Sequence, residues 1–84
     1  MRMDDRMNIV YLVFGEFARA LGLALEKDPK DEWLRFTWAT CLLHLERYQE
    51  AVAAYEEAMA KNSSWPRQGL EAARLGQQPD WAGL

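Results

Sequence analysis

Apolar residues recur at helical spacing in four stretches of the chain, and polar or proline-containing segments separate these stretches. The clearest stretch lies between residues 48 and 61, where the apolar positions are Tyr48, Ala51, Val52, Tyr55, Ala58 and Met59. A recurrence every three or four residues places side chains on one face of an α-helix. No stretch has the strict alternation of apolar and polar residues that is typical of a strand. The pattern therefore predicts an all-α fold.

Proline and glycine positions predict where the helices end and begin. Pro29 cannot continue a helix, whereas Pro66 suits the first position of one and Gly76 suits a left-handed C-terminal cap. The predicted helices span residues 5–27, 31–45, 48–61 and 66–76, and a short tail covers residues 77–84. We expect Trp81 and Leu84 of the tail to fold back onto the last helix. Links of only two to four residues predict that consecutive helices lie antiparallel.

Two motifs in the middle of the chain resemble a tetratricopeptide repeat. The more specific motif is Tyr48-x-x-Ala51-x-x-x-Tyr55-x-x-Ala58, which is similar to the second helix of such a repeat. The preceding helix carries Trp38-Ala39-x-x-Leu42-Leu43, which is similar to the first helix. In this family the small alanines allow two helices to approach closely. One departure lies in the turn between the helices, where Glu46 replaces a glycine that the family often has.

The family period of 34 residues gives a second line of resemblance. Shifting residues 48–61 back by one period pairs Ala54 with Ala20 and Ala58 with Ala24, whereas Ala51 falls on Phe17. The resemblance implies a single domain over residues 1–84. Within it, a second-helix half-repeat spans residues 5–29, a complete repeat spans 32–65, and a first-helix half-repeat spans 66–76. The alternative is an ordinary helical bundle whose alanine spacing is coincidental.

A chain of this kind is expected to bury apolar surface against a second chain. It has 84 residues, half of them hydrophobic, and a repeat unit cannot bury its apolar faces alone. The simplest arrangement is a homodimer. The candidate interface residues are Val10, Tyr11, Val13, Phe14 and Phe17. The alternative is a monomer in which Tyr11 and Phe14 cover the second helix of the same chain.

The resemblance also implies a concave groove lined by the first helix of each repeat. The groove positions in this sequence are Trp33, Phe36, Thr37, Thr40, Leu43, His44, Arg67, Leu70 and Arg74. The lysine, asparagine and arginine with which chaperone-binding members clamp a terminal carboxylate are missing. We therefore expect an apolar or amphipathic peptide as the ligand, bound by an adaptor or chaperone-like module. The alternative is a structural self-assembly module in which a sister chain fills the same surface.

Several other functions are not expected. The net charge is −3, and the basic residues are dispersed, so the footprint of a nucleic-acid binder is missing. No apolar run approaches the length of a membrane span, and we expect neither a membrane partner nor a signal peptide. Cys41 and His44 share a helix side but have no third orienting group, so we expect no enzyme, no small-molecule substrate, no metal and no cofactor. A lone thiol favours a cytoplasmic location.

Overall fold

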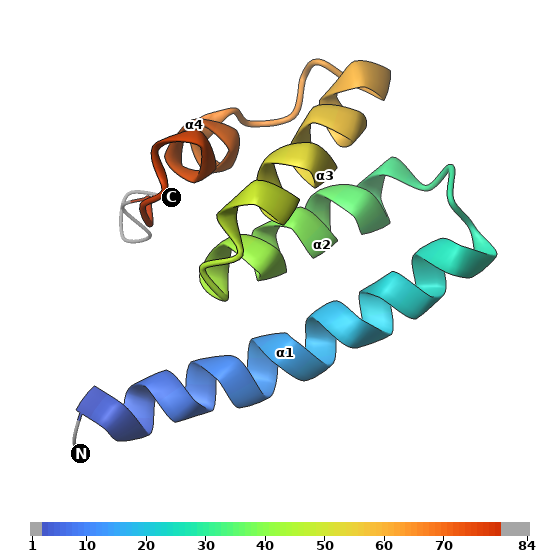
Figure 1. Cartoon of the computed structure of the whole chain (residues 1–84). Helices are drawn as coiled ribbons and strands as arrows, with labels where there is room; N and C mark the ends of the chain where they lie inside the picture. Colours follow the sequence, from blue (N-terminus) through green and yellow to red (C-terminus); the bar gives the residue numbers. More distant parts are fainter. Residues whose placement is uncertain (1–2, 80–84) are drawn as a thin grey trace.

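The computed structural model describes the backbone of residues 3–79 and the side chains of residues 13–79. Within that part of the chain it contains four α-helices and confirms the all-α prediction (Figure 1). The helices are α1 (Met3–Lys27), α2 (Glu32–His44), α3 (Tyr48–Lys61) and α4 (Gln68–Leu75). Every helix end lies within two residues of its predicted position. The predicted return of Trp81 and Leu84 onto α4 lies outside the described residues.

Each helix packs against the next one along the chain. Helix α2 is central, because α1 packs on one side of it and α3 on another, while α4 packs on α3 and also touches α2. Among the described residues, α1 contacts no helix other than α2. Figure 1 shows the N-terminal turns of α1 running past the end of α2. Within residues 3–79, one side of α1 therefore has no helix of the same chain against it.

The contact between α2 and α3 depends on small side chains. Ala39 of α2 and Ala51 and Ala54 of α3 are buried in one hydrophobic cluster, and Ala58 of α3 is also fully buried. Because alanine has only a methyl group, the two helix backbones can approach closely. Leu42, Leu43, Tyr55, Leu70 and Ala73 are the other buried members of this cluster. The predicted alanine face of residues 48–61 is therefore the face that meets α2.

A second cluster joins α1 to α2. It contains Ala18 and Leu21 of α1 together with Cys41 and Leu45, and all four are buried. Trp38 packs against both clusters, so the core is continuous through α2. At the N-terminus of α2, the Asp31 carboxylate accepts a hydrogen bond from the Leu34 amide at 3.1 Å and so caps the helix.

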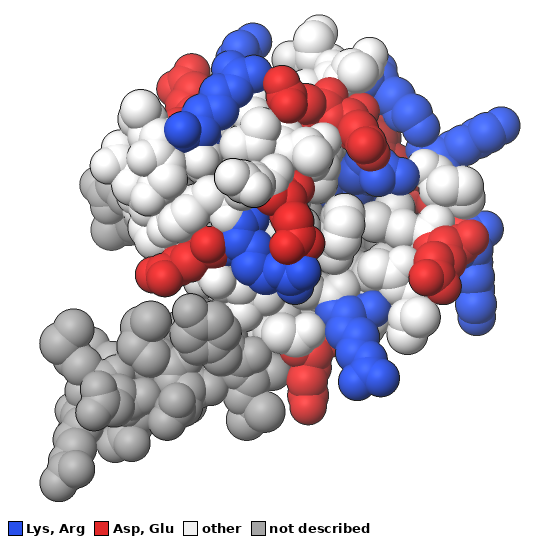
Figure 2. Space-filling model, in the orientation of Figure 1, with Lys and Arg blue, Asp and Glu red and all other residues white. Residues whose placement is uncertain are grey.

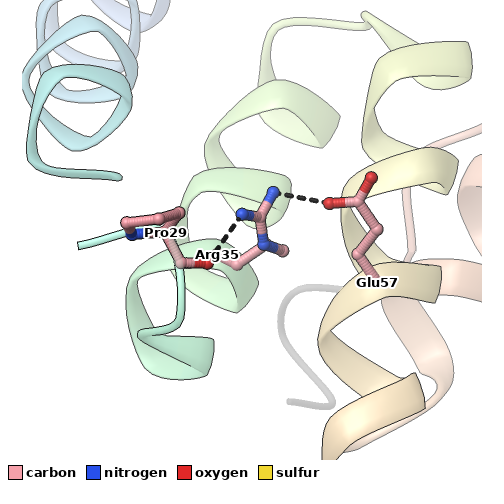
Figure 3. A network of polar contacts seen from close by, with 3 residues as sticks. All are labelled: Pro29, Arg35 and Glu57. Atoms are coloured by element: carbon pink, nitrogen blue, oxygen red, sulfur yellow. Dashed lines mark hydrogen bonds and ion pairs between the residues drawn. The ribbon is translucent and has the colours of Figure 1, made fainter. Parts of the chain in front are cut away.

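Arg35 links three parts of the chain from the surface of α2. Its guanidinium donates to the Pro29 carbonyl at 3.0 Å and to the Glu57 carboxylate at 2.6 Å (Figure 3). These contacts tie the turn after α1 to α2 and α3. Since the Glu57 side chain is largely exposed, solvent screens the ion pair and its contribution to stability is small.

Helix α4 begins later than predicted. Pro66 was expected as its first residue, but the helix begins at Gln68 and the connection from α3 is longer than the two to four residues expected. The reason is a contact from outside the helix: the Trp65 ring stacks on Phe36 of α2 with centroids 4.6 Å apart. This stacking contact holds the chain just before Pro66, and the helix therefore begins two residues later than predicted. The C-terminal prediction is confirmed, because Gly76 has a φ of 68° and closes α4 as a left-handed cap.

The turn between α2 and α3 places Glu46 in the left-handed region, with a φ of 61°. The turn is held by the amides of Glu46 and Arg47, which donate to the carbonyls of Leu43 and Leu42 at 3.0 and 2.9 Å. A left-handed conformation is unfavourable for a residue with a Cβ. We predict that Glu46→Gly raises the free energy of unfolding by about 0.5–1 kcal/mol, a gain reduced by the greater freedom of glycine in the unfolded chain.

Urea unfolding followed by circular dichroism measures this change. Glu46→Ala is the matched control, because it removes the same charge but keeps a Cβ and so should bring no gain. Equal gains from both variants would mean that the charge of Glu46, and not its backbone conformation, opposes folding.

The approach of α4 to Tyr55 generates a second prediction. A Cβ added at Gly69 would overlap the Tyr55 hydroxyl and lie 2.6 Å from its Cζ. We predict that Gly69→Ala lowers the free energy of unfolding by about 1–3 kcal/mol, although alanine ordinarily favours a helix. Gly22→Ala in α1 is the control, since its Cβ would lie 3.8 Å from the nearest atom; it should stabilise the protein by about 0.5–1 kcal/mol. A stabilising Gly69→Ala, measured by the same urea titration, would contradict the close α4–Tyr55 contact.

Candidate functional site

Two of the predicted groove residues are part of the core. Leu43 and Leu70 are buried in the cluster between α2, α3 and α4. The reason is their register: Leu43 lies one helical turn after Ala39, and Leu70 lies one turn before Ala73, and both alanines belong to the same cluster. Neither leucine lines an accessible groove, so this part of the groove prediction is wrong.

Three further groove candidates have their main contacts inside the chain. Phe36 is half-buried, with its ring stacked on Trp65 and edge-on to Tyr55 at a centroid distance of 5.3 Å. The Thr40 hydroxyl lies 2.8 Å from the Tyr55 hydroxyl and also donates to the Phe36 carbonyl at 3.1 Å. Arg74 donates to the Glu56 carboxylate at 3.2 Å. The remaining surface of the predicted groove consists mainly of Trp33, which is 56% exposed, with Thr37 and Arg67.

The aromatic cluster of Phe36, Tyr55 and Trp65 contains one unsatisfied donor. The indole Nε1 of Trp65 is buried and has no hydrogen-bond partner in the described structure. A buried donor without a partner lowers stability. The stacking of Trp65 on Phe36 therefore has to offset that cost, which fits its position as the anchor of the α3–α4 connection.

His44, another groove candidate, packs on a predicted interface residue of α1. Its imidazole stacks on the Phe14 ring with centroids 4.1 Å apart and an interplanar angle of 9°. Burial lowers the pKa of His44 below its ordinary value of 6.5. Phe14 is thus directed toward α2 of its own chain, as the monomer alternative expected for it. The side chains of Val10 and Tyr11 lie outside the described residues.

The other two predicted interface residues lie to the side of the face that packs on α2. Val13 is 54% exposed and Phe17 is 48% exposed. Ala20 is also exposed, and Ala24 is half-buried. With spacings of four, three and four residues, these positions form one stripe along α1, and we call Val13, Phe17, Ala20 and Ala24 the outer stripe. The stripe contains no charged residue.

The outer stripe corresponds to a face that is covered elsewhere in the same chain. Shifted by 34 residues, Phe17, Ala20 and Ala24 fall on Ala51, Ala54 and Ala58 of α3. All three of those alanines are buried, and Ala51 and Ala54 belong to the cluster that α3 shares with α2. In the described part of the chain, α1 contacts only α2, and the corresponding positions of α1 remain exposed or half-buried. Ala20 and Ala24 were not among the predicted site residues, although the 34-residue register alone would have indicated them.

The opposite end of the molecule is polar. The residues that α4 exposes within its helix include Gln68, Glu71 and Arg74. One apolar side chain interrupts this surface, because Leu75 is 72% exposed. It borders an open hollow of about 490 Å³ between α3 and α4, which Tyr48, Val52 and Arg74 also line. The two ends of the helical stack therefore differ, since α1 exposes an apolar stripe and α4 exposes mostly polar groups.

Charge and reactive groups suggest no other site in the described part of the chain. Figure 2 shows acidic and basic side chains interspersed over the face that it displays. Among the described residues, no three side chains of the metal-binding types gather at one point. The described helices are too short or too polar to cross a bilayer. Burial raises the pKa of the Cys41 thiol to about 11, so this thiol stays protonated and poorly nucleophilic at neutral pH.

Comparison with known proteins gives no match to a family model, to a curated protein or to a solved structure. Within the described residues, the protein is an all-α chain of consecutive helices in which one side of α1 has no helix packed on it.

The buried position of His44 predicts a pH dependence of stability. Because its pKa is lower in the folded protein, the unfolded chain binds more protons between that lowered pKa and 6.5. The free energy of unfolding should therefore fall as the pH is lowered through this window. Above pH 6.5, the charge state of His44 should have no effect on the free energy of unfolding. Urea titrations from about pH 7.5 to 5.5 measure the slope above the main carboxylate titrations. His44→Phe, which keeps the ring stack without a titrating group, should remove the slope; an unchanged slope would assign it to another group.

Proposed function

We propose that the protein is a non-enzymatic protein–protein interaction module that receives a helical segment on the outer stripe of α1. The proposal rests on the correspondence between the alanine face of α3 and the outer stripe of α1. The alanine face of α3 is buried by α2, whereas the equivalent face of α1 is exposed and includes Val13 and Phe17. An amphipathic helix is stable in water when its apolar face is covered, so this face favours a bound partner.

The class that we propose for the module is a tetratricopeptide-like array. One complete repeat over residues 32–65 follows a lone second helix and precedes a lone first helix. This assignment is supported by the 34-residue register and by the close alanine contact of α2 with α3. In such an array the helix that belongs on the outer stripe is an amphipathic first helix like α2. We place the module in the cytoplasm, because its single thiol has no counterpart for an intrachain disulfide.

A surface on α2 adjoins the outer stripe. On α1 the stripe that packs on α2 is Phe14, Ala18, Leu21 and Leu25, and on α2 the facing stripe is Leu34, Trp38, Cys41 and Leu45. On both helices, the residues one position before these form a more exposed stripe. A shift of one residue rotates a side chain by about 100° around the helix axis, and the rotation has the same sense when each helix is viewed along its own direction. Because the helices run antiparallel, the outer stripe and the exposed Trp33 face the same side of the molecule. A ligand on α1 would thus also reach Trp33 and Thr37.

Photocrosslinking tests the location of this surface. A benzoylphenylalanine in place of Phe17 should form an adduct with the helix that covers the outer stripe, and mass spectrometry should map the adduct to an amphipathic segment. The same group in place of Leu75 is the matched control, because Leu75 is also an exposed apolar residue but lies at the polar end. Adducts from position 75 and none from position 17 would contradict the proposed binding surface.

A further inference from the structure

We propose that the helix covering the outer stripe is the α1 helix of a second copy of this chain. The two α1 helices would pair antiparallel about a two-fold axis and form a homodimer. This inference rests on the proposed function, because it takes the outer stripe as the docking surface, and it goes further by naming the occupant. Three observations support it: the difference between the two ends, the order of residue sizes, and the length of α1.

The polar end of the molecule makes a head-to-tail chain of copies unfavourable. Such an assembly would place α4 of one copy on α1 of the next. Helix α4 already buries Leu70, Ala72 and Ala73 within its own chain, and the outside that remains includes Gln68, Glu71 and Arg74. Burying this surface against an uncharged stripe would remove the Glu71 carboxylate and the ion pair of Arg74 with Glu56 from water, which is unfavourable. An outer stripe of a second copy has no charged residue to desolvate, and this pairing closes as a two-fold dimer.

The order of large and small residues along the stripe is self-complementary. The two larger residues, Val13 and Phe17, come first, and the two alanines, Ala20 and Ala24, come last. An antiparallel pair that sets Phe17 against Ala20 of the second copy also sets Val13 against Ala24, because both pairs share a midpoint between residues 18 and 19. Each large side chain then meets a small one, as close helix packing requires. A parallel pair would instead set Phe17 against Phe17 and leave alanine opposite alanine.

The length of α1 also fits a second α1 as its partner. Helix α1 has 25 residues and α2 has 13. At 1.5 Å per residue, α1 is about 37 Å long and α2 about 20 Å, so α1 extends well beyond the helix that packs on it. The proposed pair aligns residues 10–27 of the two copies. That contact is longer than α2, which is already long enough to bury the equivalent face of α3.

Sedimentation equilibrium of the full chain tests the occupant. We expect twice the 9.7 kDa mass of one chain at about 100 μM, a concentration well above a micromolar dissociation constant. Phe17→Ala leaves a cavity and Ala20→Phe sets two large rings against each other, so each should weaken the dimer at least about tenfold. The double variant F17A/A20F restores a large residue opposite a small one, and its dissociation constant should return to within about threefold of the unchanged protein.

Ala53→Phe is the matched control, because it adds the same ring to an exposed alanine of α3 and should leave the dimer unchanged. Circular dichroism checks that each variant stays helical. A monomer at 100 μM would overturn the inference, and the proposed function would stand if position 17 still crosslinked to another protein. A dimer whose dissociation constant is unchanged by Phe17→Ala and Ala20→Phe, together with no adduct from position 17, would overturn both the inference and the proposed function. A dimer that both single variants weaken, but the double variant does not restore, would overturn the antiparallel pairing.

Discussion

The close packing of α2 against α3 organises the fold. Ala39, Ala51 and Ala54 are all buried there, and their small size lets two helices of modest length exclude water along their shared face. That contact presents one side of α2 to α1 and positions Tyr55 to receive α4. The proposed interface resembles this contact. The outer stripe of α1 corresponds to the face of α3 that packs on α2, but no described helix of the same chain packs on it.

The two ends of the helical stack differ in polarity, and this difference favours a dimer over a filament. At the C-terminal end, Gly76 closes α4, and Glu71 and Arg74 keep its outside compatible with water. At the other end, Val13 and Phe17 are about half exposed on a helix that contacts only α2 among the described residues. A stack with two apolar ends would grow into a filament, whereas a stack with one apolar end stops after a single pairing event. The polarity of α4 is thus as important for the proposed dimer as the stripe on α1.

Much of the fold was predictable because its determinants are local. Apolar periodicity and the positions of Pro29 and Gly76 placed the helices, and the alanine motif identified the face of α3 that meets α2. The start of α4 was not predictable in this way, because it depends on Trp65 stacking on Phe36, a contact between residues far apart in the sequence. The family resemblance led to an error at Leu43 and Leu70, because it assigned them to a groove although their register with Ala39 and Ala73 directs them into the core. Ala20 and Ala24 were not predicted for a different reason. An alanine has little apolar surface of its own, and only the 34-residue shift aligns these two with the buried alanines of α3.

In the proposed dimer, Phe17 of one chain lies against Ala20 of another, and nuclear magnetic resonance can observe that contact directly. In a sample that mixes isotope-labelled and unlabelled chains, a filtered nuclear Overhauser experiment detects only contacts between different copies. We expect a cross-peak between the Phe17 ring protons and the Ala20 methyl group. Intermolecular cross-peaks that join other surfaces, or a Phe17 ring with no intermolecular cross-peak at all, would contradict it.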